Sequence, residues 1–225
     1  MQLSIIIPTL NEAPTIAQSL SRLRHEDSCE LIVVDGGSSD GTAELARPHA
    51  DKILPTAKGR ARQMNVGARA ASGDVLLFLH ADTILPAGFT SAIEEALRDP
   101  QVVGGRFDVR LNAAGWPFRM IETMMNLRSR LTRISTGDQA IFVRREVFQQ
   151  IGGYPDIALM EDLELSRALK RAGKVACLRE RVVTSARRWQ QHGVFRTILQ
   201  MWVLRFCHFI GVPAARLRAF YADTR

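Results

Sequence analysis

The amino-acid sequence predicts an α/β fold in which helices flank a mainly parallel sheet. Over the first hundred residues, short apolar runs alternate with segments whose apolar residues recur at helical spacing. The run at residues 75–79 is apolar at every position, which is typical of a strand buried on both faces of a parallel sheet. A turn at Gly73 and Asp74 precedes this run, as expected where a strand begins.

The predicted elements follow one another in a regular order. Strands are expected at residues 3–7, 31–34, 52–54, 75–79, 102–109 and 140–143. Helices are expected at residues 15–24, from about residue 41, and at 61–71, 86–97, 118–134, 146–151, 162–172 and 194–210. Pro86 would stand at an early helical position, where its missing N–H is tolerated, and Gly173 would end the helix at 162–172.

Length and composition indicate one large domain, or a domain with an appendage. The 225 residues are 46% hydrophobic and 24% charged, which is enough apolar content for a sizeable core. The three cysteines show neither zinc-site spacing nor a disulfide pattern, so we expect a reducing, cytoplasmic location. Pro8 interrupts the first apolar run, and no apolar stretch reaches about 20 residues. We therefore expect neither a signal peptide nor a membrane-spanning helix.

Charge is unevenly distributed along the chain. Residues 1–109 hold 10 Lys and Arg against 14 Asp and Glu, whereas residues 110–225 hold 20 against 9. The basic second half suggests an anionic partner: a membrane surface, a phosphate-bearing ligand or nucleic acid. A solvated basic face without any partner would have the same composition.

The strand predicted at 75–79 stops at two groups that can bind a metal. His80 and Asp82 are two residues apart, so on an extended backbone both side chains would lie on one side. A hard divalent cation there would have a carboxylate ligand and room for phosphate oxygens. Because strands often end in an acidic residue without such a role, this segment alone decides little.

Two other predicted strands also end in polar residues. PTLNE at 8–12 follows the first strand, and VDGGSSDGT at 34–42 follows the second. Open α/β sheets bind ligands at such strand ends, where Asp35 could accept hydrogen bonds from a base or ribose. The same residues would also form an ordinary turn and helix N-cap. The G-x-G-x-x-G and Walker A patterns are absent, which disfavours ordinary dinucleotide and P-loop sites.

Charged residues also stand at two predicted helix starts. Lys58 and Arg62 lie where free N–H groups and cationic side chains would suit a diphosphate, or would form a plain surface helix. Asp162 stands at the start of the helix at 162–172. It could be the N-cap of that helix, or a general base for an acceptor hydroxyl.

Taken together, six segments resemble glycosyltransferase family 2, the nucleotide-sugar-dependent enzymes of the GT-A fold. They are PTLNE at 8–12, VDGGSSDGT at 34–42, KGRARQMNVGA at 58–68, LFLHADT at 77–83, GDQAIFVRREVFQQIGGYP at 137–155 and MEDLELSRALKRAG at 160–173. The segments come in the family's order. The chain is most similar to a short subgroup labelled arsenosugar-biosynthesis glycosyltransferases, although no residue here indicates an arsenical substrate.

The resemblance implies a GT-A (Rossmann-like) domain, which we expect at residues 1–190, and the residue pattern beyond it predicts a C-terminal amphipathic helical segment at residues 191–225. The donor would be a nucleotide-diphosphate sugar, for which UDP is the family's commonest carrier, and nucleic acid is not an expected partner. The residues implied in donor binding come from the first four segments: Pro8, Thr9, Glu12, Asp35, Gly37, Lys58, Arg62, Asn65, His80 and Ala81.

The resemblance also implies a metal and a catalytic base. Asp82 matches the last acid of the family's DXD motif, so Mn²⁺ or Mg²⁺ would bind there and bridge the donor diphosphate. Asp162, paired with Glu161, would act as the base in a single in-line displacement with inversion. His80 replaces the first Asp of the motif, which favours Mn²⁺, and Gly36 stands where many members carry a second Asp.

On the acceptor side the resemblance points to five residues: Asp138, Gln139, Arg187, Arg188 and Trp189. The last three belong to SARRW at 185–189, which is similar to the QxxRW block of processive members but lacks its Gln. The two arginines could hold a phosphate, and the tryptophan could stack on a sugar. His192 is either a further metal ligand, as a late His is in some GT-A enzymes, or a loop residue without a role.

The helix predicted at 194–210 has a wide apolar face and a narrow polar stripe that contains Arg196, Gln200 and His208. Such a helix can lie in a membrane interface, with Trp202 at headgroup level, or pack against its own domain or a partner subunit. The membrane alternative would place the protein on the inner face of the cell membrane and would fit a lipid-linked acceptor.

The implied function is that of a metal-dependent inverting glycosyltransferase that moves a sugar from a nucleotide-diphosphate sugar to an acceptor hydroxyl. Two alternatives stand beside it: a non-catalytic nucleotide-sugar-binding protein and a sugar-phosphate nucleotidyltransferase. The glycine-rich basic loop of nucleotidyltransferases is missing near the first strand, which counts against the second alternative.

Overall fold

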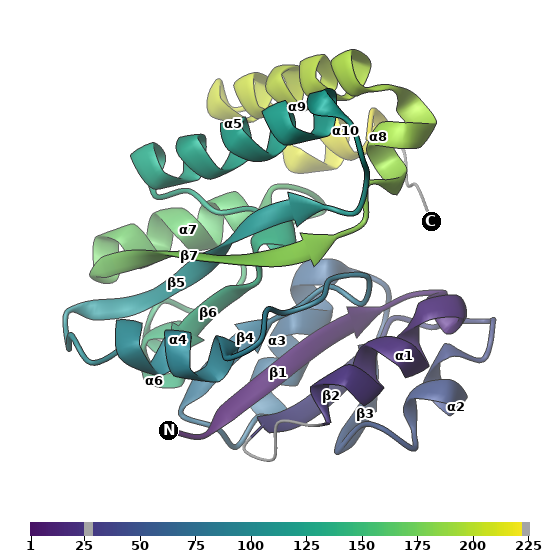
Figure 1. Ribbon diagram of the computed structural model, residues 1–225, viewed down its shortest axis with the longest axis vertical. Helices are drawn as coiled ribbons and strands as arrows, with labels where there is room; N and C mark the ends of the chain where they lie inside the picture. The colour runs from purple at the N-terminus through teal and green to yellow at the C-terminus, as the bar shows by residue number, and fades with distance from the viewer. Residues whose placement is uncertain (25–28, 222–225) are drawn as a thin grey trace.

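A computed structural model describes residues 1–24 and 29–221, and within them one mixed sheet runs through the molecule (Figure 1). The strand order is β3-β2-β1-β4-β6-β5-β7. The strands are β1 Leu3–Thr9, β2 Cys29–Asp35, β3 Lys52–Pro55, β4 Val75–Phe78, β5 Val102–Leu111, β6 Ile141–Arg144 and β7 Lys174–Thr184. All pairings are parallel except those of β6, which is antiparallel to β4 and to β5. The α/β fold with a mainly parallel sheet is therefore confirmed.

Helices cover both faces of the sheet, because successive residues of its buried strands point to opposite sides. Ile5 and Ile7 of β1 belong to one core with α1, α2 and α4, whereas Ile6 belongs to a second core with α3, α6 and α7. The helices are α1 Ala13–Leu23, α2 Thr42–Ala46, α3 Arg60–Ala70, α4 Phe89–Ala96, α5 Trp116–Thr132, α6 Arg145–Gln150, α7 Glu161–Ala172, α8 Arg187–His192, α9 Val194–Phe209 and α10 Ala214–Ala219.

Most predicted elements are present, with ends shifted by a few residues. The predicted start of the helix at Pro86 is wrong: α4 begins at Phe89, and Gly88 before it has a left-handed φ of 71°. The strand β7 and the helices α8 and α10 were not predicted. β7 lies at the sheet edge, and its charged residues 179–181 are exposed, so it lacks the apolar run that marks an inner strand.

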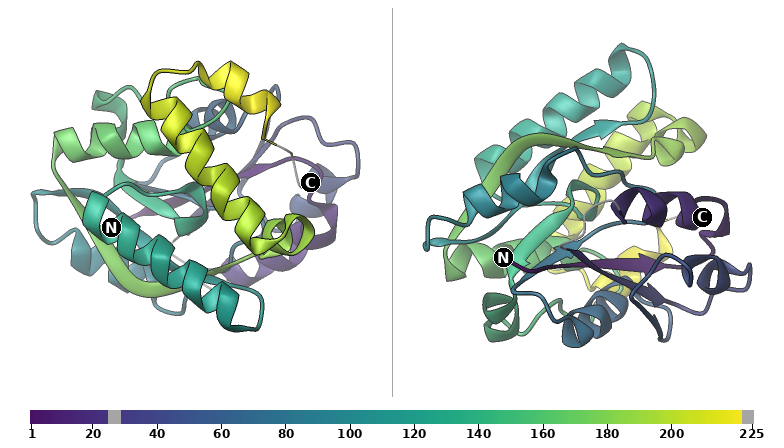
Figure 2. Two further views of the ribbon diagram at one scale, coloured as in Figure 1. Left: turned by 90° about the horizontal axis from the view of Figure 1, so that it is seen from above. Right: turned by 60° about the horizontal axis from the view of Figure 1, so that its bottom comes forward.

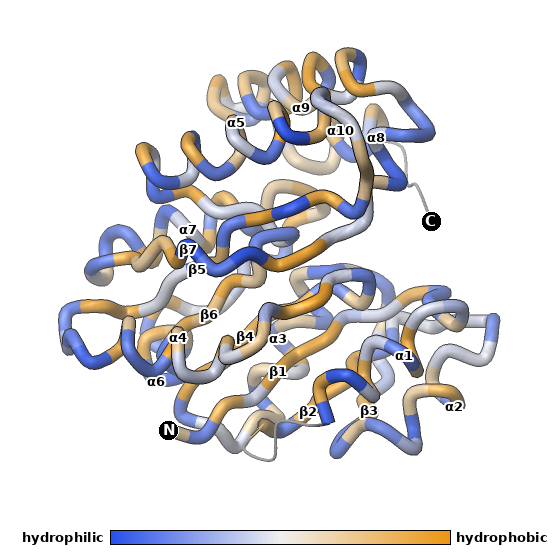
Figure 3. The backbone as a smooth tube through the Cα atoms, viewed as in Figure 1, coloured by the Kyte–Doolittle hydropathy of each residue, from blue (hydrophilic) through white to orange (hydrophobic). Residues whose placement is uncertain are grey.

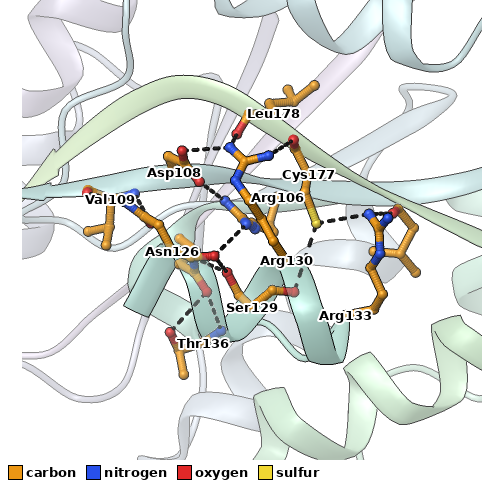
Figure 4. A network of polar contacts seen from close by, with 12 residues as sticks. Arg106, Asp108, Val109, Asn126, Ser129, Arg130, Arg133, Thr136, Cys177 and Leu178 are labelled. Atoms are coloured by element: carbon orange, nitrogen blue, oxygen red, sulfur yellow. Dashed lines mark hydrogen bonds and ion pairs between the residues drawn. The ribbon is translucent and has the colours of Figure 1, made fainter. Parts of the chain in front are cut away.

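Four helices of the second half of the chain, α5, α8, α9 and α10, form a layer above β5 and β7 (Figures 1 and 2). A buried ion network attaches α5 to these strands (Figure 4). Arg106 of β5 is fully buried and pairs with Asp108, and Asp108 also accepts a bond from Arg130 of α5 at 2.6 Å. Arg130 further donates to the carbonyls of Cys177 and Leu178 in β7. No helix of the described residues is long and apolar enough to cross a membrane.

The chain changes direction along the sheet at β1: β2 and β3 lie to one side of it, and β4 lies to the other. In open α/β sheets a ligand crevice forms at the carboxyl ends of the strands where the order reverses. The carboxyl ends of β1 and β4, which carry residues 8–12 and 80–82, are therefore the first place to look for a site.

Candidate active site

A cavity of about 1430 Å³ opens at the carboxyl ends of β1 and β4. It is larger than the roughly 300–1,000 Å³ of a typical single-ligand site. One part is lined by strand ends and the start of α3, and the other by α5, the start of α7, α8 and α9. The cavity therefore has room for two reactants, one above the sheet edge and one beneath the helical layer.

The residues after β1 and β2 divide into cavity-lining and supporting groups. Pro8 and Glu12 line the cavity, whereas Thr9 is fully buried beneath them. The Asp35 carboxylate accepts bonds from the backbone N–H of Gly37 and of Ser38, at 3.0 and 2.9 Å, and from the Thr9 hydroxyl at 3.2 Å. Asp35 thus shapes the turn that follows β2.

Gln63 of α3 supports both strand ends, a role that the sequence did not suggest. Its side-chain amide donates to the carbonyls of Thr9 and Val34, at 2.8 and 2.9 Å, and is buried. A Cβ atom at Gly36 would lie 3.0 Å from this amide nitrogen. The glycine found in place of a second Asp therefore leaves the space that Gln63 needs.

The start of α3 brings cationic groups to the cavity: Lys58, Arg60 and Arg62 all line it. Arg62 is paired with the exposed Asp156 at 3.2 Å. Arg60 lies deeper, with Nη1 3.8 Å from the Glu161 carboxylate. Burial alone would lower the pKa of Arg60, but Glu161 and further carboxylates raise it above its ordinary value. Arg60, which the sequence did not single out, is the arginine of this segment that pairs with Glu161 at the start of α7.

Asn65, also of α3, lies outside the cavity. Its side-chain amide donates to the Tyr154 carbonyl at 2.7 Å and accepts from the Tyr154 N–H at 3.0 Å. Both ends of the amide are therefore engaged in holding the loop that contains Tyr154, and the structure assigns Asn65 a supporting position.

His80 and Asp82 both line the cavity, but they do not stand on extended backbone as expected. β4 ends at Phe78, and the chain then turns, with the Thr83 N–H donating to the His80 carbonyl at 3.0 Å. Ala81, which was expected to contact the donor, is buried in this turn, and its carbonyl accepts a bond from the Ser19 hydroxyl.

A chain of contacts joins His80 to the start of α7. His80 packs so closely on Gly137 that a Cβ there would lie 2.7 Å from its Nε2 atom. The Gly137 N–H donates to the Asp162 carboxylate at 2.8 Å. His80 therefore limits the space around the peptide that holds Asp162.

Asp162 is not the N-cap of α7: the cap is Met160, with a left-handed φ of 70°. Asp162 instead lies in the first turn and lines the cavity beside Glu161. Burial, followed by the negative charge of Glu161, raises the pKa of Asp162 to about 6, although the Gly137 N–H and Arg60 oppose the shift. A carboxylate with such a pKa is suited to accept a proton near neutral pH.

Of the five residues expected on the acceptor side, four line the cavity and one does not. Asp138, Arg187, Arg188 and Trp189 line the cavity, and the Arg188 guanidinium lies 4.0 Å from the ring centre of Tyr221. Gln139 is fully buried, forms a capping box with Thr136, and donates to the Ser129 hydroxyl at 3.0 Å. Its position is structural.

The groups that could hold a metal are few. Asp82 offers a carboxylate to the cavity, and His80 is its nearest neighbour in sequence. His192 ends α8 rather than lying in a loop, and it does not line the cavity. No group of three or more His, Cys, Asp and Glu occurs in the described ranges. One carboxylate fits a cation whose other ligands are diphosphate oxygens and water, as is common for Mg²⁺.

The sequence is similar to those of known glycosyltransferases. The sequence pattern of glycosyl transferase family 2 matches residues 4–152. The chain is 34% identical to a PGL/p-HBAD biosynthesis glycosyltransferase of Mycobacterium bovis, across 67% of this chain and 62% of that protein. It is 30% identical to the glycosyltransferase YaiP of Escherichia coli, across 75% and 47%. The chain thus spans only about half to three-fifths of the curated relatives it matches.

Solved structures show the same fold. The mannosyltransferase PcManGT of Pyrobaculum calidifontis, in complex with GDP-Man and Mn²⁺, superposes with a TM-score of 0.68 at 23% identity, over 92% of this chain and 61% of that chain. TarS of S. aureus in complex with UDP-GlcNAc superposes with a TM-score of 0.66 at 19% identity, over 82% and 58%. These likenesses confirm the predicted GT-A fold.

Proposed function

Because the chain belongs to glycosyl transferase family 2, we propose that it transfers a sugar from a nucleotide-diphosphate sugar to an acceptor hydroxyl with inversion. One observation supports this most strongly. The Asp162 carboxylate, whose pKa is raised to about 6, lines the same cavity as Asp82 and the cationic start of α3. Groups suited to act as a base, to hold a metal and to bind a diphosphate thus line a single cavity.

The donor would lie above the carboxyl ends of β1 and β4. Pro8, Glu12 and the turn held by Asp35 would contact the nucleoside, while Lys58 and Arg60 would offset the charge of the diphosphate. The relatives bind different nucleotides, since PcManGT holds GDP-Man and TarS holds UDP-GlcNAc. We propose a uridine nucleotide for this chain and assign no sugar.

Asp82 would hold Mn²⁺ or Mg²⁺ in this proposal. When bound, the metal would neutralise charge on the leaving diphosphate. Asp162 would take the proton of the acceptor hydroxyl, whose oxygen forms the new bond to the anomeric carbon as the bond to the diphosphate breaks. Burial, followed by the negative charge of Glu161, raises the pKa of Asp162 into the range that suits this transfer.

We further propose residues 1–190 as the catalytic domain and residues 191–225 as the segment that completes the acceptor side, since α9 lines the cavity. We also propose that, within the family, the chain is most similar to the subgroup labelled arsenosugar-biosynthesis glycosyltransferases. A position on the inner face of a cell membrane is likewise part of the proposal, and it is supported by the apolar residues that α9 exposes.

A thermal-shift panel of UDP-, GDP- and dTDP-sugars with and without Mn²⁺ tests the donor site. At about 100 times Kd, a donor should stabilise the fold by about 2.7 kcal/mol, or roughly 5–10 °C for a chain of this size. Asp82→Ala should abolish the metal-dependent part, whereas Asp99→Ala, which changes an exposed acid outside the cavity, should not. Equal stabilisation of wild type and Asp82→Ala would refute the metal site.

Asp162→Asn separates an enzyme from a non-catalytic binding protein. Donor stabilisation should survive this change, because the proposed donor position is over β1 and β4, while turnover should fall by about 10²–10⁴-fold. A coupled assay that detects the released nucleoside diphosphate reports turnover even when water is the acceptor. An unchanged rate in Asp162→Asn would show that this carboxylate is not the base.

A further inference from the structure

Hydrophobic residues alternate with hydrophilic ones along the helices of the layer above the cavity (Figure 3). α5 and α9 lie over the acceptor end of the cavity, and both line it. Large hydrophobic side chains are exposed along these helices and just after them: Trp116, Met124, Leu127, Leu131, Phe195, Leu199, Trp202, Val203, Phe206, Phe209, Ile210 and Phe220. A patch of this kind on a protein surface marks an interaction site.

Two arginines stand inside the cavity beneath this apolar surface. Arg128 comes from α5 and Arg205 from α9, and both line the cavity. The Nη2 atom of Arg128 is buried and has no hydrogen-bond partner among the described residues. Burial, followed by the positive charge of Arg205, lowers the pKa of Arg128 to about 10. Two guanidinium groups that line one cavity and repel each other would be stabilised by an anion bound between them.

We propose that the groove between α5 and α9 binds a lipid acceptor whose phosphate lies at Arg128 and Arg205 and whose acyl chains run along the exposed apolar side chains. This inference rests on the proposed function and names its acceptor class. An anionic head would give the unbonded Nη2 atom of Arg128 a partner, and the apolar walls would contact a hydrocarbon tail. A soluble anion would leave the walls without a role, and a membrane surface alone would not reach arginines inside the cavity.

The arrangement also places the lipid head next to the base. Asp138 and Asp162 line the same cavity as Arg128, and their negative charges oppose the lowering of its pKa. A hydroxyl on the head group of a phospholipid would then be within reach of Asp162. Its oxygen forms the glycosidic bond, Asp162 takes its proton, and the nucleoside diphosphate leaves with the electron pair.

The test uses the full chain and dioctanoyl phosphatidylglycerol below its micelle concentration, measured by calorimetry. This probe should bind at least about tenfold more tightly than glycerol phosphate, which lacks the chains, and dioctanoylglycerol, which lacks the phosphate. Arg128→Gln and Arg205→Gln should each weaken binding by about tenfold or more, because each removes a charge-assisted contact. The matched controls Arg179→Gln and Arg216→Gln change exposed arginines outside the cavity and should bind like the wild type.

Leu131→Gln, at a side chain that is 75% exposed, gives a second variant that should fold normally and still lose lipid affinity. The inference is overturned if glycerol phosphate binds as tightly as the lipid, or if the groove variants bind like their controls. It is also overturned if sedimentation shows that the apolar face pairs two copies of the chain and excludes the lipid. Donor stabilisation is recorded on the same proteins. Its presence without lipid binding refutes this inference alone, and its absence from the wild type refutes the proposed function.

Discussion

Gly137 separates His80 from Asp162, so replacing it with alanine should disturb both residues. The new Cβ would lie 2.7 Å from His80 Nε2, closer than real contacts of this kind. Either the imidazole or the 137 peptide has to move. A moved peptide would lose the 2.8 Å bond from the Gly137 N–H to the Asp162 carboxylate.

The size of the effect follows from this bond. A hydrogen bond to a charged group contributes roughly 1.5–3 kcal/mol, which corresponds to about one to two pKa units. The bond lowers the pKa of Asp162, so its loss should raise that pKa from about 6 to roughly 7–8. Because only the deprotonated form accepts a proton, the acidic limb of kcat/KM should move to higher pH by the same amount.

Two measurements check this shift. Carbon-13 NMR of labelled aspartate follows the Asp162 carboxyl directly, and the pH profile of donor turnover follows its role. The double variant His80→Ala/Gly137→Ala removes the obstacle and should return the midpoint toward about 6. A midpoint that is the same in wild type and Gly137→Ala would refute the reasoning, as would a shift that His80→Ala leaves unchanged.

Three further changes have defined outcomes. Arg60→Met removes a charge that lowers the pKa of Asp162, so the acidic limb of the kcat/KM profile should move to higher pH. Donor affinity should also fall, which titration calorimetry would measure. Gln63→Ala leaves two buried carbonyls without their donor, and urea unfolding should show a loss of roughly 1–3 kcal/mol with an unchanged m-value. Asp108→Ala leaves the buried Arg106 without its partner, and the same method should show a loss of roughly 3–5 kcal/mol.

The inner strands could be predicted because burial on both faces leaves a continuous apolar run. β7 escaped prediction for the opposite reason, since an edge strand with exposed charges resembles a loop or helix in composition. The same limit applies to the helix ends. Asp162 was expected as a possible N-cap, but the cap is Met160 in a left-handed conformation that side-chain preferences do not indicate.

Sequence motifs indicated some of the residues that line the cavity, although the roles predicted for them stay predictions. His80, Asp82 and Asp162 line one cavity as the motifs suggested. Arg60 and Arg62 are two residues apart, and only the direction of α3 shows that Arg60 lies by the carboxylates. Arg128 and Arg205 are separated by 77 positions, so no spacing rule could bring them together.

The two helices that line the proposed acceptor groove, α5 and α9, are attached to the rest of the protein by different kinds of contact. α5 is tied to β5 and β7 by the ion network of Arg106, Asp108 and Arg130, whereas only Thr197 and Leu204 of α9 are buried. α9 meets α7 through His208, whose Nε2 lies 2.8 Å from Glu164. We expect α9 to separate from the rest of the protein at a lower free-energy cost than α5, because the buried ion network attaches α5, and not α9, to the sheet.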